Sequence, residues 1–189
     1  MVTDFSGGHI LWFTGLSGAG KSTIARALNT KLRKRNVPAI VLDGDELRTG
    51  LNADLGYSEA ERTENLRRIA HVANLFLQQG FVTIVATISP EQKHRDAARA
   101  IVGKRFTEIL IDAPLEVCEA RDPKGLYKRA RHGDIPNFTG VAAPYDRPVN
   151  PDISLDTQAL SVDECVQTIM DFLERHACHD ITELHGKNG

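Results

Sequence analysis

The chain has 189 residues, of which 41% are hydrophobic and 25% charged, and its formal net charge is −2. This length suits a single domain with a sizeable core, and the near-neutral charge argues against general affinity for nucleic acid or anionic membranes. The sequence has no apolar run of membrane-spanning length and no signal-peptide pattern at its start. Cys118, Cys165 and Cys178 are an odd number without metal-binding spacing, so we expect a cytoplasmic protein whose redox regulation is open.

Apolar, strand-like runs alternate with helical patterns along the chain. The expected strands are residues 10–14, 39–42, 81–87, 106–111 and 153–155. This alternation predicts parallel β-α-β units, and the unbroken apolar character of the runs predicts a sheet covered by helices on both faces. We therefore predict an α/β domain over residues 1–175, with about five parallel strands in a three-layer fold. A polar tail over residues 176–189 follows.

The expected helices have recognisable ends. A helix from Ser22 to about residue 35 follows the first strand, and a long helix over residues 58–79 begins with a Ser58–Glu61 capping box and ends before Gly80. The pairs Ser89 with Gln92 and Ser161 with Glu164 indicate two further helix starts, with the serine as N-cap. In the tail, His176, Cys178, His179 and His185 show no recurrent ligand spacing, which favours a solvated segment over a metal site.

Residues 15–23 (GLSGAGKST) directly follow the first apolar run and match G-x-x-x-x-G-K-[ST] in its required setting between a strand and a helix. The glycines let backbone N–H groups turn inward around a phosphate chain. Lys21 is placed to reach the β- and γ-phosphates and Ser22 to ligate Mg²⁺, while the helix N-terminus favours the same anion. The sequence thus predicts binding of a nucleoside triphosphate with Mg²⁺ by Gly15, Ser17, Gly18, Ala19, Gly20, Lys21, Ser22 and Thr23.

Such a loop alone leaves motors, GTPases and kinases open. The N-K-x-D motif of GTPases does not occur, and Asp122 to Gly125 matches the switch pattern D-x-x-G only after a helical run. Kinases of small molecules need an acidic group near the γ-phosphate. Asp43 and Asp45 follow the second strand, where they could hold Mg²⁺ or accept a proton from an attacking hydroxyl. Arg48, Arg62 and Asn65 are further polar candidates for the same cleft.

Residues 121–131 carry five basic residues and a single acid. A solvated helix surface could have this composition. The breaks at Pro123 and Gly125, beside a phosphate-binding core, instead favour a mobile lid that brings lysine and arginine to the transferring phosphoryl group.

Seven segments together resemble the adenylylsulfate kinase (APS kinase) family in colinear order over about residues 8–173. They are residues 15–23, 42–48 (LDGDELR), 50–57 (GLNADLGY), 62–68 (RTENLRR), 88–90 (ISP), 121–128 (RDPKGLYK) and 137–140 (NFTG). The resemblance implies that ATP phosphorylates the ribose 3′-hydroxyl of adenylyl sulfate, giving the sulfate donor PAPS in sulfate assimilation. It also implies the P-loop kinase strand order 2-3-1-4-5, a homodimer and a possible functional link to ATP sulfurylase.

The resemblance further implies roles for individual residues. Lys21 and Lys124 would stabilise charge during in-line transfer, Asp45 would act as base or, with Ser22, as metal ligand, and Arg121 and Leu160 would contact ATP. The implied acceptor residues are Asp43, Asp45, Arg48, Tyr57, Arg62, Asn65, Ile88, Ser89, Lys124, Asn137 and Phe138, with Phe138 as a stacking platform for adenine.

Several readings stay open from the sequence. Ser89 is either a phosphoserine intermediate or, as we prefer, a residue that caps its helix and contacts the acceptor. Phe76 is either a second stacking face or part of the core. Another small-metabolite kinase, for a sugar acid or a nucleoside, and a nucleotide-sensing protein without an acceptor are the alternative functions.

Overall fold

The structure is a computed structural model that describes residues 7–185, and of residues 177–185 only the backbone. Its central feature is a five-stranded parallel sheet in the order β2-β3-β1-β4-β5, which confirms the predicted fold. The elements in chain order are β1 (His9–Thr14), α1 (Lys21–Lys34), β2 (Ala39–Asp43), α2 (Gly44–Leu47), α3 (Glu59–Gln78), β3 (Val82–Ala86), α4 (Gln92–Val102), η1 (Gly103–Arg105), β4 (Phe106–Asp112), α5 (Leu115–Arg121), α6 (Leu126–Arg131), β5 (Ile153–Asp156) and α7 (Val162–His185).

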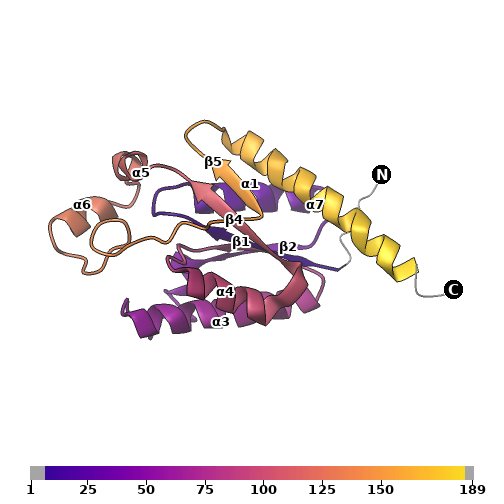
Figure 1. Ribbon diagram of the computed structural model, residues 1–189, viewed down its shortest axis with the longest axis horizontal. Helices are drawn as coiled ribbons and strands as arrows, with labels where there is room; N and C mark the ends of the chain where they lie inside the picture. Colours follow the sequence, from indigo (N-terminus) through magenta and orange to yellow (C-terminus); the bar gives the residue numbers. More distant parts are fainter. Residues whose placement is uncertain (1–6, 186–189) are drawn as a thin grey trace.

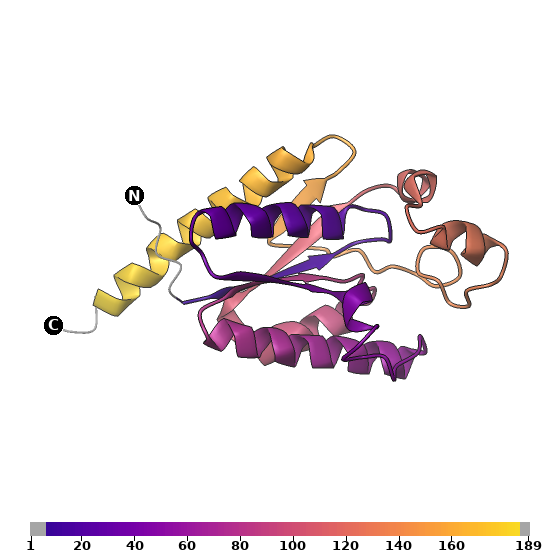
Figure 2. The ribbon, with the colours of Figure 1, turned by 180° about the vertical axis from the view of Figure 1, so that it is seen from behind.

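Helices cover both faces of the sheet. Helices α1 and α7 lie on one face and α3 and α4 on the other (Figures 1 and 2). The central strand β1 shows why a covered strand is apolar along its whole length, because successive side chains of a strand point to opposite faces. Leu11 and Phe13 join the core beneath α1 and α7, whereas Ile10 and Trp12 join the core beneath α3 and α4. Helices α5 and α6 lie apart from these layers, beyond one end of the sheet (Figure 1).

The local signals predicted two of the helix starts correctly. Ser58 caps α3 with a full capping box, and Gly80 follows the helix in a left-handed conformation with φ of 82°. Ser161 and Glu164 make the same reciprocal contacts before α7.

The prediction that Ser89 caps a helix is wrong. Helix α4 begins three residues later, at Gln92, and its N-cap residue Glu91 makes no side-chain cap. The Ser89 hydroxyl instead accepts a hydrogen bond of 3.0 Å from the buried indole Nε1 of Trp12, a donor that must find a partner inside the core.

The last helix extends past the expected start of the tail. Helix α7 covers Val162–His185, so the predicted boundary at residue 176 falls within it. The side chains of Cys178, His179 and His185, and residues 186–189, lie outside the part of the chain that the structure describes. Within that part, no helix has both the length and the apolar content needed to cross a bilayer.

Candidate active site

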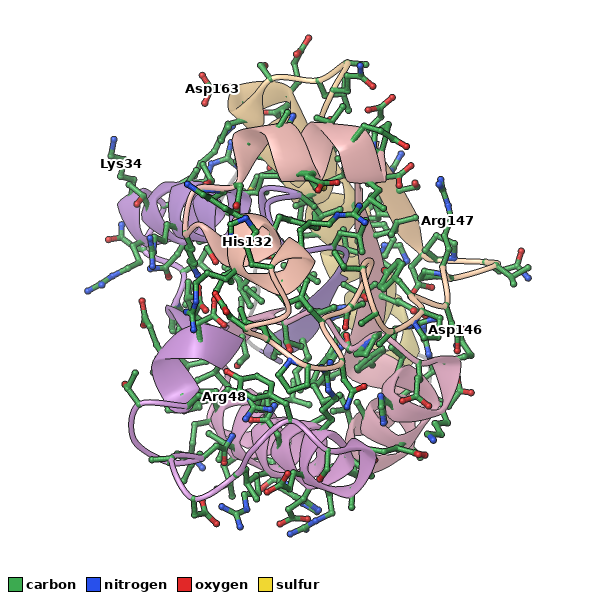
Figure 3. All side chains as sticks on the ribbon, turned by 90° about the vertical axis from the view of Figure 1, so that its left-hand side faces the viewer. Lys34, Arg48, His132, Asp146, Arg147 and Asp163 are labelled. Carbon is green, nitrogen blue, oxygen red and sulfur yellow. The ribbon has the colours of Figure 1, made fainter. Side chains whose placement is uncertain are left out.

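A large cleft opens at the carboxyl ends of the strands, the edge at which parallel α/β sheets bind ligands. Its volume of about 860 Å³ lies near the upper end of the range for a single small ligand, roughly 300–1,000 Å³. The loop before α1, the segment after β2, the turn after β3 and the α5–α6 segment line it. Figure 3 looks onto this end, with Arg48 and the α6-capping residue His132 labelled.

The loop before α1 requires glycine where its backbone approaches β4 and α5. Gly15 has φ of 149°, and a Cβ there would lie 2.3 Å from the carbonyl oxygen of Ile111. Gly18 has φ of 78°, and its Cβ would lie 2.8 Å from the carbonyl oxygen of Cys118. Helix α1 starts at Lys21 directly after this loop, so its free N–H groups face the cleft, as anion binding requires.

Lys21 is buried at the base of this loop. Its Nζ donates hydrogen bonds of 2.8 Å to the carbonyl oxygen of Gly15 and 2.7 Å to that of Leu16. Burial lowers the pKa of Lys21 to about 8, although the nearby carboxylates of Asp45 and Asp43 act in the opposite direction. An anion placed beside this ammonium group would restore its pKa towards the ordinary value.

This pKa predicts that nucleotide binding takes up a proton. At pH 8.5 Lys21 of the free protein is largely deprotonated, whereas bound triphosphate favours the charged form. Calorimetric titration with ATP in two buffers of different ionisation enthalpy should show uptake of most of one proton at pH 8.5 and far less at pH 6.8. The Lys21→Arg variant, which stays charged, is the control and should show no such difference. Equal uptake by both proteins at pH 8.5 would contradict the assignment to Lys21.

The two aspartates after β2 have different partners. Asp43 is buried, and its Oδ2 accepts a hydrogen bond of 2.6 Å from the Ser22 hydroxyl, while its Oδ1 accepts one of 3.0 Å from the backbone N–H of Asp45. The Asp45 side chain points elsewhere, because it forms an ion pair with Lys124. The structure therefore joins Ser22 to Asp43 and not to Asp45, its expected partner in holding a metal ion.

The basic segment of residues 121–131 forms the end of α5, a turn and α6. Asp122 accepts hydrogen bonds of 3.1 Å from the backbone N–H groups of both Tyr127 and Lys128, so the carboxylate of the D-x-x-G match binds the first turn of α6. The buried Tyr127 donates its hydroxyl to the carbonyl oxygen of Ser17 at 3.0 Å. This contact attaches α6 to the loop before α1. The ion pair between Lys124 and Asp45 connects the turn before α6 with the segment after β2. Arg121 donates to the carbonyl oxygen of Thr157 at 2.8 Å.

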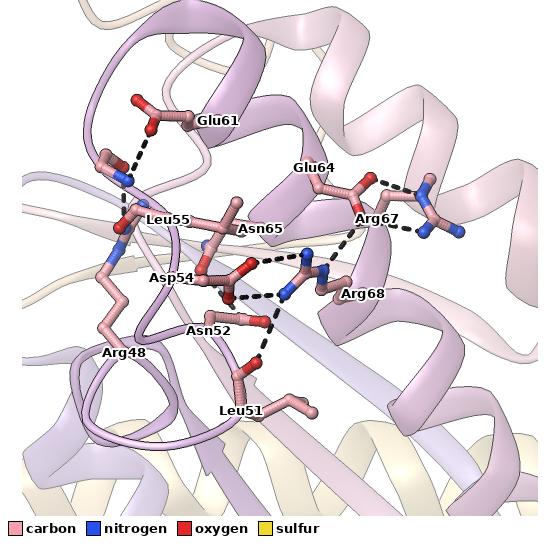
Figure 4. A network of polar contacts seen from close by, with 11 residues as sticks. Arg48, Leu51, Asn52, Asp54, Leu55, Glu61, Glu64, Asn65, Arg67 and Arg68 are labelled. Carbon is pink, nitrogen blue, oxygen red and sulfur yellow. Dashed lines mark hydrogen bonds and ion pairs between the residues drawn. The ribbon is translucent and has the colours of Figure 1, made fainter.

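The segment between α2 and α3 is held in place by polar contacts with α3 (Figure 4). Arg68 binds both Asp54, at 2.8 Å, and Glu64, at 2.9 Å. The amide of Asn52 donates to the Oδ1 atom of Asn65 at 3.0 Å. Arg48 itself donates to two carbonyl oxygens of this segment, those of residues 55 and 56. The segment thus presents Arg48 to the cleft in a fixed position.

Two arginines and an aromatic ring form the opposite side of the cleft. The Arg48 guanidinium lies 4.4 Å from the ring centre of Tyr57, and that of Arg62 lies 5.8 Å from it. Arg62 also donates to the carbonyl oxygen of Asn137 at 2.7 Å and to the Thr139 hydroxyl at 3.0 Å. A half-exposed ring beside two positive charges suits a ligand that carries both a base and an anion.

The structure brings nearly all of the predicted site residues together. The exceptions are Gly15, which supports the loop from behind, and Asn137, which contributes its carbonyl oxygen to Arg62. Phe138 borders the cleft but is only 8% exposed, and it packs edge-on against Tyr127 with ring centres 5.1 Å apart. Phe76 packs against Phe81 away from the cleft, which supports the core interpretation.

Some residues of the site could not be found from the sequence. Thr157 lines the cleft and donates to the carbonyl oxygen of Ala19 at 2.9 Å. Its only sequence signal is its place after the fifth strand.

Two cysteines lie at or near the cleft. Cys165 lines it, and Cys118 lies beneath the loop before α1. Both are buried free thiols whose pKa is raised by burial.

Comparison with known proteins decides the family. A family model described as adenylylsulphate kinase matches residues 7–156. The chain belongs to the adenylylsulphate kinase family. It is 58% identical over 163 residues to an adenylyl-sulfate kinase of Paraburkholderia xenovorans, an alignment that covers 86% of this chain and 91% of the relative.

Solved structures of the family agree. The chain is similar to the Mycobacterium tuberculosis APS kinase CysC in complex with AMPPNP and APS, with 51% identity and a TM-score of 0.86. That alignment covers 88% of this chain and 98% of the mycobacterial one. A hexameric APS kinase from Thiobacillus denitrificans is 34% identical with a TM-score of 0.67, and the match covers 90% of this chain but 29% of that longer one. A gluconokinase from Sinorhizobium meliloti is 18% identical with a TM-score of 0.60, and the match covers 97% of this chain and 99% of that one. At this identity the likeness shows the fold alone.

Proposed function

We propose that this protein is an adenylylsulfate kinase that transfers the γ-phosphoryl group of ATP to the ribose 3′-hydroxyl of adenylyl sulfate. One observation carries the proposal: the cleft has two anion-binding sides, with the Lys21 loop on one and the Arg48–Tyr57–Arg62 cluster on the other. A second nucleotide as acceptor requires such a second site for a base and an anion. A sugar acid requires no aromatic face.

The chain's own residues divide the work between donor and acceptor. Lys21 and the loop amides would bind the ATP phosphates, and Arg121 and Leu160 lie where they could contact the rest of the donor. Lys124, at the tip of the α5–α6 turn, would stabilise charge on the transferring group. The ion pair between Asp45 and Lys124 would break when the ligands bind. The exposed carboxylate of Asp45 would then accept the proton of the attacking hydroxyl.

The residues near Ser22 fit a magnesium ion. Mg²⁺ prefers oxygen ligands and keeps several of them from phosphates and water. The Ser22 hydroxyl and the Asp43 carboxylate provide such oxygens side by side, and organising the metal is the alternative to the role of base for Asp45. No three His, Cys, Asp or Glu side chains gather as a complete metal site in the described part of the chain, so ATP would supply the remaining ligands. When bound, the ion would neutralise charge on the β- and γ-phosphates.

We propose that Ser89 contacts the acceptor and is not phosphorylated. Its side chain is 1% exposed and accepts a hydrogen bond from Trp12, which leaves its one hydrogen free to donate to a ligand. Substitution Ser89→Ala should therefore raise the KM for adenylyl sulfate, while retaining measurable kcat. Steady-state kinetics check this, with Ser161→Ala, a helix cap outside the acceptor cluster, as control. Loss of all turnover, together with stoichiometric labelled phosphate trapped on the wild-type serine, would establish the covalent route instead.

Release of ADP measured with and without an acceptor tests the proposed function. The protein should release ADP rapidly only when adenylyl sulfate is present, and gluconate, a nucleoside or no acceptor should give little release. Fast release with gluconate would favour a sugar-acid kinase, and release independent of any acceptor would favour a nucleotide-hydrolysing sensor.

We further propose that the protein works in the cytoplasm as a homodimer, with a functional link to ATP sulfurylase, which produces adenylyl sulfate. The family resemblance supports these three points. Analytical ultracentrifugation of the purified chain tests the dimer.

A further inference from the structure

We propose that Arg95 is a positioning residue for the acceptor site, acting through the backbone of Ser89. This proposal rests on the proposed function, because it assumes that the turn at residues 88–89 contacts adenylyl sulfate. Arg95 belongs to α4 and is not among the described residues that line the cleft, so it does not touch the ligand itself.

The Ser89 turn has a conformation that needs support from its surroundings. Ser89 has φ of 38°, in a region that residues with a side chain rarely adopt and that costs free energy unless neighbouring groups hold it. The residue lies at the wall of the cleft, beside Ile88. A small relaxation of this turn would move both the Ser89 hydroxyl and the adjoining backbone relative to a bound acceptor.

A layer of polar side chains, three of them buried and one half-buried, holds the turn from behind. We call Trp12, Thr14, Arg95 and Tyr145 the backing layer. Arg95 donates to the Ser89 carbonyl oxygen at 2.8 Å, and Thr14 donates to that of residue 88 at 2.7 Å. Since the Thr14 hydroxyl has one hydrogen, the Tyr145 hydroxyl at 2.9 Å is the donor to Thr14. With the Trp12–Ser89 contact, each member of the layer fixes the turn directly or through Thr14.

Arg95 also joins the turn to a second segment. Its other terminal nitrogen donates to the carbonyl oxygen of Asp146 at 2.7 Å, and the backbone N–H of Asp146 donates to that of Pro90, also at 2.7 Å (Asp146 is labelled in Figure 3). Asp146 lies in the chain segment that returns from α6 towards β5. One guanidinium therefore links the Ser89 turn to the segment between α6 and β5.

Burying the charged guanidinium of Arg95 costs desolvation free energy. We therefore infer that its hydrogen bonds do more than fill space in the core. Its side chain is 0% exposed, and its Nε lies 2.6 Å from the Oε1 atom of Glu108 on β4. A buried ion pair of this kind is often replaceable by apolar residues without loss of stability. What apolar residues or lysine cannot supply is a rigid planar fork that reaches two carbonyl oxygens at once.

The test separates positioning from a purely structural role. The double variant Arg95→Met with Glu108→Leu removes both buried charges and the fork, and Arg95→Lys keeps the charge but offers one donor group. The control, Arg99→Met, removes a neighbouring arginine that lies 3.7 Å from the same Glu108 carboxylate but makes no contact with Ser89. For each folded protein, kcat/KM for adenylyl sulfate and the dissociation constant for ATP are measured.

The double variant should lose about tenfold or more in kcat/KM for adenylyl sulfate, with ATP affinity unchanged within about twofold. Arg95→Lys should be intermediate and Arg99→Met close to wild type. Wild-type kcat/KM in a folded Arg95 variant, or equal losses for both nucleotides, would overturn the proposal. If neither Arg95 variant folds, Tyr145→Phe decides: a selective loss for adenylyl sulfate supports the backing layer, and no loss overturns it. Absence of acceptor-dependent turnover in the wild type would instead refute the proposed function.

Discussion

Replacement of Lys21 by methionine should abolish phosphoryl transfer without unfolding the protein. Two loop carbonyl oxygens hold the Lys21 ammonium group at the proposed triphosphate position, so we expect it to contribute to ligand binding and to stabilise charge that develops during transfer. Removal of one such preorganised donor costs about 10²–10³-fold in kcat. We expect at least this loss, with cooperative thermal unfolding retained.

The same variant makes a prediction about stability and pH. The pKa of Lys21 is about 8 in the folded state and 10.5 in the unfolded state, so between these values the unfolded chain binds more protons. The free energy of unfolding of the wild type relative to Lys21→Met should therefore rise as pH increases from 8 to 10.5, by up to about 3 kcal/mol. Below pH 8 the difference should be constant. Chemical denaturation at pH 7, 9 and 10 measures it, and a difference that falls with pH would contradict the burial effect.

Substitution Lys124→Ala should lower kcat strongly while changing ATP affinity only modestly. Lys124 pairs with Asp45, so the α5–α6 turn reaches the segment after β2, where we propose that the phosphoryl group passes to the acceptor. A group that stabilises charge mainly in the transition state affects kcat more than ground-state binding. We expect a loss of about 10²-fold in kcat and a change of no more than about threefold in the dissociation constant for ATP.

The matched control is Lys128→Ala, which removes a lysine of the same segment that does not line the cleft. It should retain wild-type kcat. Hydrogen exchange gives an independent check, because residues 121–131 should become protected only when both nucleotides are bound. Equal kinetics of the two alanine variants, with no change in exchange on saturation, would show that the segment is a solvated basic surface.

The fold could be predicted where local signals and the hydrophobic pattern agree. Strands β1 and β3 are almost completely buried because helices cover both faces of the sheet, and Ser58 and Ser161 cap their helices through contacts within four residues. Ser89 has an equally good cap sequence, but a distant indole N–H competes for its hydroxyl. The two residues of this contact are 77 positions apart in the chain, so the sequence around Ser89 does not indicate it. The strand order likewise came from family resemblance and not from spacing.

The site shows the same division. The loop around Lys21 could be assigned because its chemistry depends on consecutive residues. The choice between Asp43 and Asp45 as the partner of Ser22 could not, because it depends on which carboxylate α2 turns back towards the loop. Arg95 gave no signal at all, since in sequence it is one of several charged residues of a helix, and only the fold shows that it is buried against Ser89.

The central claim is that one cleft holds two nucleotides and transfers phosphate between them at a defined hydroxyl. Phosphorus NMR of the product formed from ATP and adenylyl sulfate tests it most directly. The account predicts a new phosphate monoester on the ribose 3′ carbon, formed in equal amount to ADP, and no product from the 3′-deoxy analogue of adenylyl sulfate. Phosphate attached at another position, or ADP released with free phosphate and unchanged adenylyl sulfate, would contradict it.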